Sequence, residues 1–295
     1  MRTSACLGAV ALVAMSAPGP RATSTGPATG VQWQHVGAGL ERTTVDVTAP
    51  GGGWRTRVVA VRVDSSRFTF RLRARLRGVD PAWSVDRAPA DAVLALNTGQ
   101  FNGITPWGWV VMHGEEIRPP GTGPLSVAIA WDRAGRVHWL APREIGSARA
   151  SGEIVEAFQS FPVLIDASGT VPRAIREPGL GVDVEHRDAR LAIGTLADGR
   201  LILAITRFNG LGELSPPVPL GPTLAEMADV MRGLGCTRAV SLDGGVSAQL
   251  MLRENGRTRV WRGWRRVPVG LVAEPRDKAA AARMAGPLQA APANE

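Results

Sequence analysis

The chain has no tyrosine, and lysine occurs once, at Lys278, among 34 basic side chains. Arginine therefore supplies nearly all of the formal net charge of +8, and the arginines are spread along the chain rather than gathered in one block. Nucleic-acid binders concentrate their basic side chains and interleave them with aromatic ones. We therefore expect no nucleic-acid partner, whereas an anionic substrate is compatible with the charge.

Cysteine is also scarce, with only Cys6 and Cys236 in 295 residues. Cys6 lies in an apolar N-terminal segment that we expect to be removed, which leaves Cys236 alone. An intrachain disulfide and a cysteine-based metal site are then excluded. Cys236 follows a predicted helix and precedes an apolar segment, which favours an inert core thiol.

Histidine is rare too, and its four positions show no spacing typical of zinc ligands. We predict that the protein uses no cofactor. A divalent cation held by Asp243 and its neighbours stays open, although no EF-hand or other cation-loop spacing occurs.

The N-terminal apolar run, Ala5 to Met15, is too short to cross a membrane as a mature helix. It follows Arg2 and precedes small residues, a pattern typical of a secretory signal. We predict a signal peptide over 1–17, a flexible linker over 18–30, one domain over 31–274 and a disordered tail over 275–295. From the signal peptide we predict a secreted or periplasmic protein whose mature chain has no transmembrane segment. The lack of disulfides favours a bacterial export route. The oligomeric state is left open.

Between linker and tail, most segments have the pattern of β-strands. Residues 67–76 alternate strictly between apolar and polar side chains, which predicts one buried and one solvated face. The arginines of the polar face could also bind an anion. Further strands are expected at 58–63, 92–96, 109–112, 127–131, 137–140, 163–165, 191–193, 201–206, 239–242, 248–252 and 267–272.

One helix is clear. Thr223 and Glu226 form a capping box, apolar residues recur at three- and four-residue spacing to Leu234, and Gly235 follows as a stop. A second, weaker helix is expected at 81–87. The fold class is therefore α+β, with a large mixed, mostly antiparallel sheet and few helices.

Four polar segments stand at the ends of predicted strands, where a rigid scaffold presents functional groups. The most informative combines a carboxylate, two glycines and a hydroxyl in Asp243, Gly244, Gly245 and Ser247, although a plain β-turn would also use Asp and Gly. The segments are Asn97–Gly103, Ser160–Pro162, Asp188–Arg190 and Ser241–Ser247.

In this order, the segments resemble the phosphodiester glycosidase family, which includes the lysosomal uncovering enzyme and exported bacterial relatives. The resemblance covers roughly residues 90 to 272. It is carried by an Asn-Gly-Gly-Phe-Phe-like turn at 97–101, Trp107-Gly108, a Ser-Phe-Pro-x-Leu segment at 160–164, an Arg-x-Ala-x-Gly strand at 190–194, the Asp198-Gly199 hairpin, the helix at 223–234 and a Leu-Asp-Gly-Gly-x-Ser turn at 242–247.

The chain departs from the family pattern at two places. Thr98 and Gln100 stand where the family usually has Gly and Phe. The segment Arg207-Phe208-Asn209-Gly210 stands where an Asp-Gly turn is common. Both departures bear on the identity of the sugar and on activity.

The resemblance implies cleavage of a sugar-1-phosphodiester. Asp243 would act at the anomeric carbon as a general base or nucleophile, and the Arg190 guanidinium would bind phosphate oxygens. Asn97 would complete the catalytic set by holding the sugar, together with Gln100. Backbone N–H groups at Gly244 and Gly245 are expected to bind the phosphate as well, and Ser160 and Ser247 would contact the phosphate or orient Asp243.

Glycosidases usually need a second carboxylate. The candidates are Glu115, Glu116, Asp183, Glu185 and Asp188, and His186 is the one histidine placed to assist proton transfer. Alternatively, the protein is a non-catalytic polysaccharide-binding or cell-envelope module on the same fold. Sugar stacking on tryptophan would serve that function, with Trp107, Trp109, Trp261 and Trp264 near predicted loops. Asn97, Arg190 and Asp243 are expected to surround one cavity.

Overall fold

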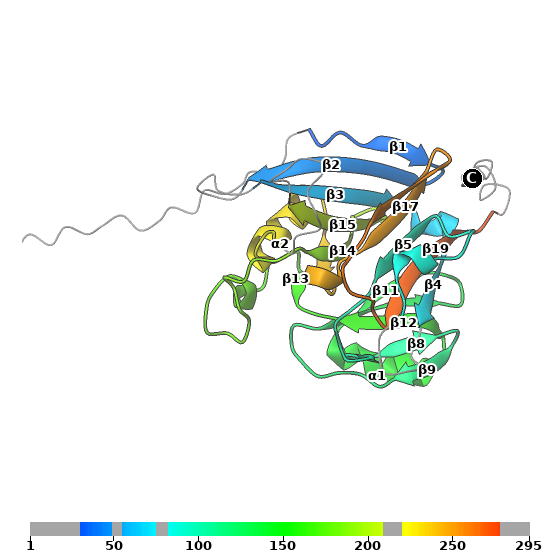
Figure 1. The fold of residues 1–295 in the computed structure, drawn as a ribbon. Helices are drawn as coiled ribbons and strands as arrows, with labels where there is room; N and C mark the ends of the chain where they lie inside the picture. The colour runs from blue at the N-terminus through cyan, green and yellow to red at the C-terminus, as the bar shows by residue number, and fades with distance from the viewer. Residues whose placement is uncertain (1–29, 49–54, 75–81, 209–219, 278–295) are drawn as a thin grey trace, which may run out of the picture.

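Figure 1 shows the computed structural model, which describes residues 30–48, 55–74, 82–208 and 220–277. The expected signal peptide, nearly all of the expected linker and residues 278–295 of the expected tail lie outside these ranges. The ordered chain continues past Glu274, because the last strand ends at Pro275 and the Arg276 N–H donates to the Arg67 carbonyl.

The largest sheet has seven strands, and all its neighbouring strands are antiparallel. It forms the upper layer in Figure 1. Its order is β1 (Gln34–Gly37), β2 (Leu40–Thr48), β3 (Arg55–Val63), β15 (Leu201–Phe208), β14 (Leu191–Thr195), β16 (Arg238–Ser241) and β13 (Val163–Ile165).

Two five-stranded antiparallel sheets and a small hairpin complete the β-structure. The first contains β11 (Val137–Leu140), β10 (Val127–Asp132), β12 (Ile154–Ser160), β8 (Val110–Met112) and β9 (Glu115–Arg118). The second contains β18 (Arg257–Trp261), β17 (Leu250–Glu254), β5 (Leu94–Asn97), β19 (Val269–Pro275) and β4 (Phe68–Ala74). The hairpin pairs β6 (Phe101–Asn102) with β7 (Thr105–Pro106).

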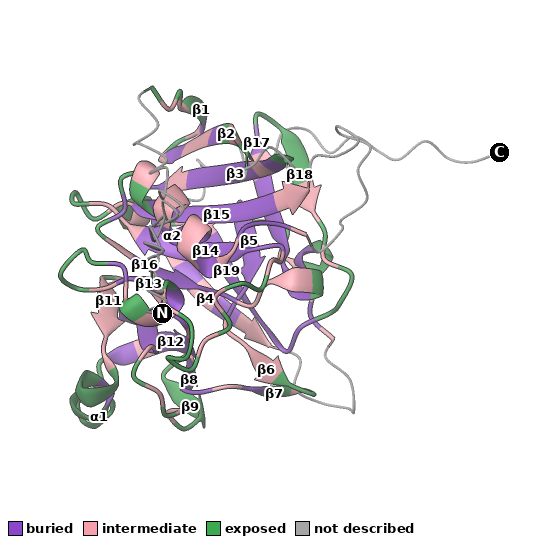
Figure 2. Cartoon of the chain, turned by 90° about the vertical axis from the view of Figure 1, so that its left-hand side faces the viewer, coloured by how far each residue is buried: buried purple, intermediate pink, exposed green. Residues whose placement is uncertain are grey.

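The central strands are buried on both faces, whereas α1 and the outer loops are exposed (Figure 2). One hydrophobic cluster joins side chains from all three large sheets, among them Val61, Leu96 and Ile129. This interior holds the sheets together by burying apolar surface. The predicted α+β class with mostly antiparallel strands and few helices is confirmed, and the strands divide among several sheets rather than one.

The predicted long helix is present as α2 (Leu224–Gly233), with Thr223 as its N-cap and Glu226 completing the capping box. Its apolar face packs on the seven-stranded sheet through Met227 and Met231, both fully buried. Gly235 follows with φ near +90°, a conformation that glycine adopts without a Cβ clash. α2 therefore fixes the strand β16, which leads directly to Asp243.

The helix α1 (Pro142–Ser151) was not predicted, because Ile145 is its one buried residue and the apolar periodicity is weak. The expected helix at 81–87 is wrong over its described part, which holds only a 3-10 turn at Val85–Arg87. Among the described residues, neither α-helix is long and apolar enough to cross a membrane.

The alternation predicted for 67–76 is confirmed along β4, where Phe68, Phe70 and Leu72 are buried. The arginines opposite form ion pairs, Arg71 with Glu156 and Arg73 with Glu274. Their charge is therefore already matched by carboxylates, which disfavours an anion-binding face. Residues 75 and 76 lie outside the described ranges.

Cys236 is buried, with no disulfide within the described residues. Burial raises the pKa of its thiol to about 12, so the reactive thiolate is scarce at neutral pH. The structure is consistent with a core thiol.

Candidate active site

The turn Asp243–Ser247 is held from two sides by backbone hydrogen bonds. The Leu242 N–H donates to the Leu191 carbonyl at 2.8 Å, and the Asp243 N–H donates to the Thr98 carbonyl at 3.0 Å. A Cβ added at Gly244 would lie 2.5 Å from the Ala189 carbonyl oxygen. The glycine is therefore required for the turn to approach the segment that precedes β14.

The carboxylate of Asp188 lies against the same turn. Its Oδ1 accepts the Ala189 N–H at 2.8 Å, and the Ala189 carbonyl accepts the Gly245 N–H at 2.7 Å. A Cβ added at Gly245, whose φ is +57°, would lie 2.6 Å from Asp188 Oδ2. Two carboxylates from distant parts of the chain, Asp188 and Asp243, thus flank one glycine turn.

The other candidates for the second carboxylate lie elsewhere or point to solvent. Glu116 is paired with Arg149 at 2.7 Å and accepts the Trp109 indole N–H. The remaining three are exposed: Glu115, Asp183 and Glu185. Of the five candidates, the structure brings Asp188 to the turn.

The pKa of Asp243 is raised to about 6, chiefly because burial disfavours its charged form. A hydrogen bond from the buried Ser247 and the charge of Arg265 act in the opposite direction, while the negative charge of Asp188 raises the pKa further. A carboxyl group with a pKa near 6 can exchange protons close to neutral pH.

His186 stands beside this pair, with its Nε2 3.5 Å from Asp188 Oδ2 and its side chain 58% exposed. The Asp183 carboxylate accepts the His186 backbone N–H and fixes the loop. The predicted proximity of His186 to Asp188 is therefore present.

Arg190 is 8% exposed and hydrogen-bonds mainly to backbone. Its Nε donates to the Pro222 carbonyl at 2.9 Å, its Nη2 to the His186 carbonyl, and its own N–H to the Thr206 hydroxyl. Burial lowers the pKa of its guanidinium, against the attraction of Asp188. Nη1 has no hydrogen-bond partner within the described ranges, so this nitrogen is the one available to an anion.

Asn97, Gln100 and Ser160 connect three of the four polar segments to one another, those at 97–103, 160–162 and 241–247. Asn97 Nδ2 donates to the Asp243 carbonyl at 2.8 Å, and Ser160 Oγ donates to the Ser241 carbonyl at 2.6 Å. Gln100 Nε2 donates to the Phe161 carbonyl at 2.6 Å. All three use their polar atoms internally, which points to positioning of the turn rather than direct contact with substrate.

Both family departures are accommodated by local contacts. Thr98 is buried and donates its hydroxyl to the Val269 carbonyl. Arg207 Nη2 donates to the Ala248 carbonyl at 2.8 Å and to the Arg262 carbonyl at 3.1 Å. Asn209 and Gly210 lie outside the described residues.

Sequence reasoning missed Arg265, which also reaches the turn. Its N–H donates to the Val246 carbonyl at 3.0 Å, and its guanidinium lies 4.9 Å from the centre of the Phe101 ring. The arginine pair at 265–266 is visible in the sequence, but no spacing relates it to Asp243.

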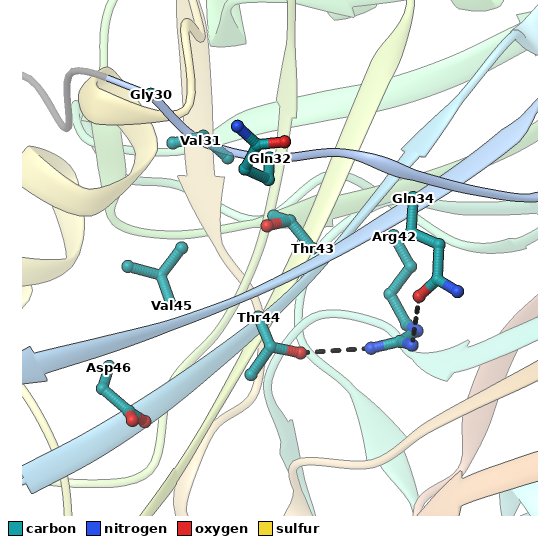
Figure 3. Close-up of a pocket in the computed structure, with 9 residues that line it drawn as sticks. All are labelled: Gly30, Val31, Gln32, Gln34, Arg42, Thr43, Thr44, Val45 and Asp46. Atoms are coloured by element: carbon teal, nitrogen blue, oxygen red, sulfur yellow. Dashed lines mark hydrogen bonds between the residues drawn. The ribbon is translucent and has the colours of Figure 1, made fainter.

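Three cavities among the described residues lie outside the carboxylate turn, and none of the three is lined by Asn97, Arg190 or Asp243. One, of about 500 Å³, is lined by aromatic residues that include Trp107 and Phe161, and it adjoins the site through Gln100 and Phe101. A second, of about 490 Å³, lies beside α1 and β13. The third, of about 600 Å³, is lined by residues of the 30–46 segment at the β1–β2 edge (Figure 3).

The β1–β2 cavity is unsuited to an anion, because its arginine is already engaged. Arg42 donates to Thr44 and Gln34, as Figure 3 shows, and it also pairs with Glu254. None of its lining residues belongs to the polar segments at the strand ends.

The tryptophans differ sharply in exposure. Trp109 is 1% exposed and therefore unable to stack on a sugar, whereas Trp264 is 59% exposed. Trp107 packs edge-on against Phe161, and Trp261 packs against the main core. Within the described residues, no cluster of three metal-ligating side chains occurs.

Known proteins share the family and the fold of this chain. The sequence model of the phosphodiester glycosidases matches residues 90–274. The fold is similar to the catalytic domain of zebrafish N-acetylglucosamine-1-phosphodiester α-N-acetylglucosaminidase, auto-inhibited by its pro-peptide, at 18% identity over 84% of this chain and 89% of that one, with a TM-score of 0.62.

Two further solved structures share the fold. A hypothetical protein from Synechocystis is 17% identical over 81% of this chain and 62% of its own, with a TM-score of 0.56. A putative exported protein from Burkholderia pseudomallei is 15% identical over 77% and 75%, with a TM-score of 0.50. No curated protein matches the chain in sequence.

Proposed function

The chain belongs to the phosphodiester glycosidase family, and we propose that it is an exported hydrolase that cleaves sugar-1-phosphodiester linkages in envelope polymers or glycoconjugates. One observation carries this proposal: Asp188 and Asp243 flank the same glycine turn. Paired carboxylates of this kind are what glycosidic bond cleavage requires. The N-terminal apolar segment supports an extracytoplasmic site of action.

In the proposed reaction, Asp243 acts as the general base. It takes a proton from a water molecule whose oxygen attacks the anomeric carbon. The bond from that carbon to the phosphate oxygen breaks, and its electron pair leaves with the phosphate. The products are the free sugar and a phosphate monoester on the carrier.

Asp188 supplies the second carboxylate. Its negative charge stabilises the positive charge that develops at the anomeric carbon, and His186 Nε2 lies 3.5 Å from its Oδ2. A phosphate monoester is a good leaving group, so no separate acid has to protonate it. Arg190, at the other end of the segment Asp188–Arg190, presents Nη1 of its positively charged guanidinium to the phosphate oxygens.

A panel of sugar-1-phosphodiesters, incubated with the purified protein, tests the proposal. Asp243→Asn and Asp188→Asn are each expected to lower kcat at least a hundredfold. Glu185→Gln is the matched control, because it removes an exposed carboxylate from the same segment. Absence of hydrolysis across the panel, or equal activity in all variants, would contradict the proposal.

A glycan-binding module remains the second candidate, favoured by the 59% exposure of Trp264. That function predicts glycan binding without turnover. Binding that persists unchanged in Asp243→Asn, with no product released by the parent protein, would establish it in place of hydrolysis.

A further inference from the structure

One cavity is lined by residues of two sheets, the seven-stranded sheet and the five-stranded sheet that contains β10 and β11. It holds about 490 Å³, a size typical of sites for small organic molecules, and we call it the α1–β13 cavity. Its lining comes from the start of β10 and the loop before it, from β11, from the start of α1, from β13 with the turn after it, and from the first residue of β16. No residue of the lining belongs to the four polar segments of the candidate active site.

The lining of the α1–β13 cavity is mostly apolar. Val127 and Ile165 are buried, whereas Trp139 and Val163 pack against the main core and are only half-buried. The Val163 N–H donates to the Leu125 carbonyl at 2.7 Å, which ties β13 to the loop before β10. A ligand with an apolar body would therefore remove from water an apolar surface that the fold itself leaves partly uncovered.

Two arginines, Arg143 and Arg238, also line the cavity. Among the residues that the structure describes, neither guanidinium has a partner for a hydrogen bond or an ion pair. Arg238 is half-buried, so part of the cost of withdrawing its charge from water is met in the fold itself. A planar guanidinium in this condition suits a carboxylate, whose two oxygens accept two parallel N–H groups.

The two acidic residues of the lining do not match these positive charges. Asp166 Oδ1 accepts the N–H groups of Ser168 and Thr170, at 2.8 and 2.9 Å, and so holds the turn after β13. Glu144 Oε2 accepts the Ala141 N–H at 2.7 Å, at the start of α1. Both carboxylates are engaged by backbone donors of their own segments. Since the lining carries two charges of each sign, an anion is recognised here by direct contact rather than by long-range attraction.

We propose that the α1–β13 cavity is a binding site for a small amphipathic carboxylate, of the class of medium-chain fatty acids. The apolar body lies against Trp139 and Val163, and Arg238 binds the carboxylate. A single negative charge fits better than the double charge of a phosphate monoester, which Asp166 and Glu144 would repel more strongly. This site goes beyond the proposed hydrolysis and does not depend on it.

Calorimetric titration of the full chain with three probes separates the two parts of the site. Octanoate has the apolar body and the charge, octanol has only the body, and acetate has only the charge. Octanoate is expected to bind about tenfold to hundredfold more tightly than octanol, as for a charge-assisted hydrogen bond, and acetate to show no binding at the same concentrations. No binding of octanoate, equal affinities for octanoate and octanol, or equal affinities for octanoate and acetate would overturn the proposal.

Variants assign the binding to this cavity. Arg238→Gln is expected to lower the affinity for octanoate to that for octanol and to leave octanol unchanged. Arg232→Gln controls for the loss of one positive charge, because it removes an exposed arginine of α2 outside the lining.

A second pair of variants tests the space itself. Ala167→Trp places an indole at an exposed position of the lining and is expected to weaken both octanoate and octanol about tenfold or more. Ala150→Trp, at an exposed alanine of α1 outside the lining, is expected to weaken neither. An affinity for octanoate that Arg238→Gln or Ala167→Trp leaves unchanged, or that the control variants lower equally, would overturn the assignment.

Discussion

Asn97 donates from Nδ2 to the carbonyl of Asp243 at 2.8 Å, while its Oδ1 accepts the Gln249 N–H at 2.9 Å. One fully buried amide thus fixes the backbone on both sides of the glycine turn. The strand β5, which ends at Asn97, thereby sets the position of a carboxylate 146 residues further along the chain.

Replacing Asn97 should therefore destabilise the fold as well as the site. Asn97→Ala leaves the carbonyl of half-buried Asp243 and the buried Gln249 N–H without partners, and we expect a loss of about 2–4 kcal/mol. Urea unfolding measures this loss. Asn102→Ala, at an exposed asparagine five residues away, should change stability by less than about 0.5 kcal/mol. A mild effect at Asn97 would show that its two hydrogen bonds do not hold the turn.

Gly245 offers a separate test of the contact with Asp188. In Gly245→Ala the new Cβ would meet Asp188 Oδ2 at 2.6 Å, so the carboxylate must move and activity should fall at least tenfold. An alanine at this positive φ also costs about 1 kcal/mol of stability through its backbone conformation alone. Gly181→Ala has a similarly positive φ, +85°, with open space around it, and isolates that backbone cost. Equal activity in the two variants would argue against a role for Asp188.

Most strands could be predicted because they are short apolar runs or alternate between apolar and polar residues, and α2 could be predicted because its capping box and apolar stripe agree. The strand β12 could not be predicted from the sequence, because two polar residues, Glu156 and Gln159, are buried in it. Glu156 accepts the Leu72 N–H and Gln159 accepts the Trp109 N–H, both at 3.0 Å. Leu72 belongs to β4 and Trp109 directly precedes β8, so nothing in the local sequence marks the polar residues as buried.

In the site, too, the local motifs could be predicted from the sequence and the contacts between distant segments could not. Asp243 and its glycines form a local motif that the sequence reveals. The choice of Asp188 over Asp183 or Glu185 depends on the contact with Gly245, which only the folded chain creates. Arg265 was missed for the same reason, because its backbone bond to Val246 joins segments with no shared pattern.

The charges around Asp243 predict shifts of its pKa in opposite directions. Asp188→Asn removes a negative charge that raises the pKa, so the midpoint near 6 should fall. Arg265→Gln removes a positive charge that lowers it, so the midpoint should rise. Carbon NMR titration of the aspartate carboxyl groups measures both, with Arg266→Gln as the control. Shifts in the same direction in both variants would contradict the proposed surroundings of Asp243.

The raised pKa of Asp243 also predicts how stability depends on pH. An unfolded aspartate titrates near 3.8, whereas burial raises the pKa of folded Asp243 to about 6. Between these values the folded state holds more protons than the unfolded state, so the Asp243 carboxyl destabilises the fold more and more as the pH rises. Above pH 6 this destabilisation stays constant.

The Asp243→Asn side chain is always neutral and escapes this cost. The free energy of unfolding of the variant minus that of the parent protein should therefore be about 2 kcal/mol larger at pH 7 than at pH 4. Urea unfolding at the two pH values measures this difference, and Asp91→Asn, at an exposed aspartate, controls for the loss of one negative charge. The same difference at both pH values would mean that Asp243 titrates normally in the folded protein.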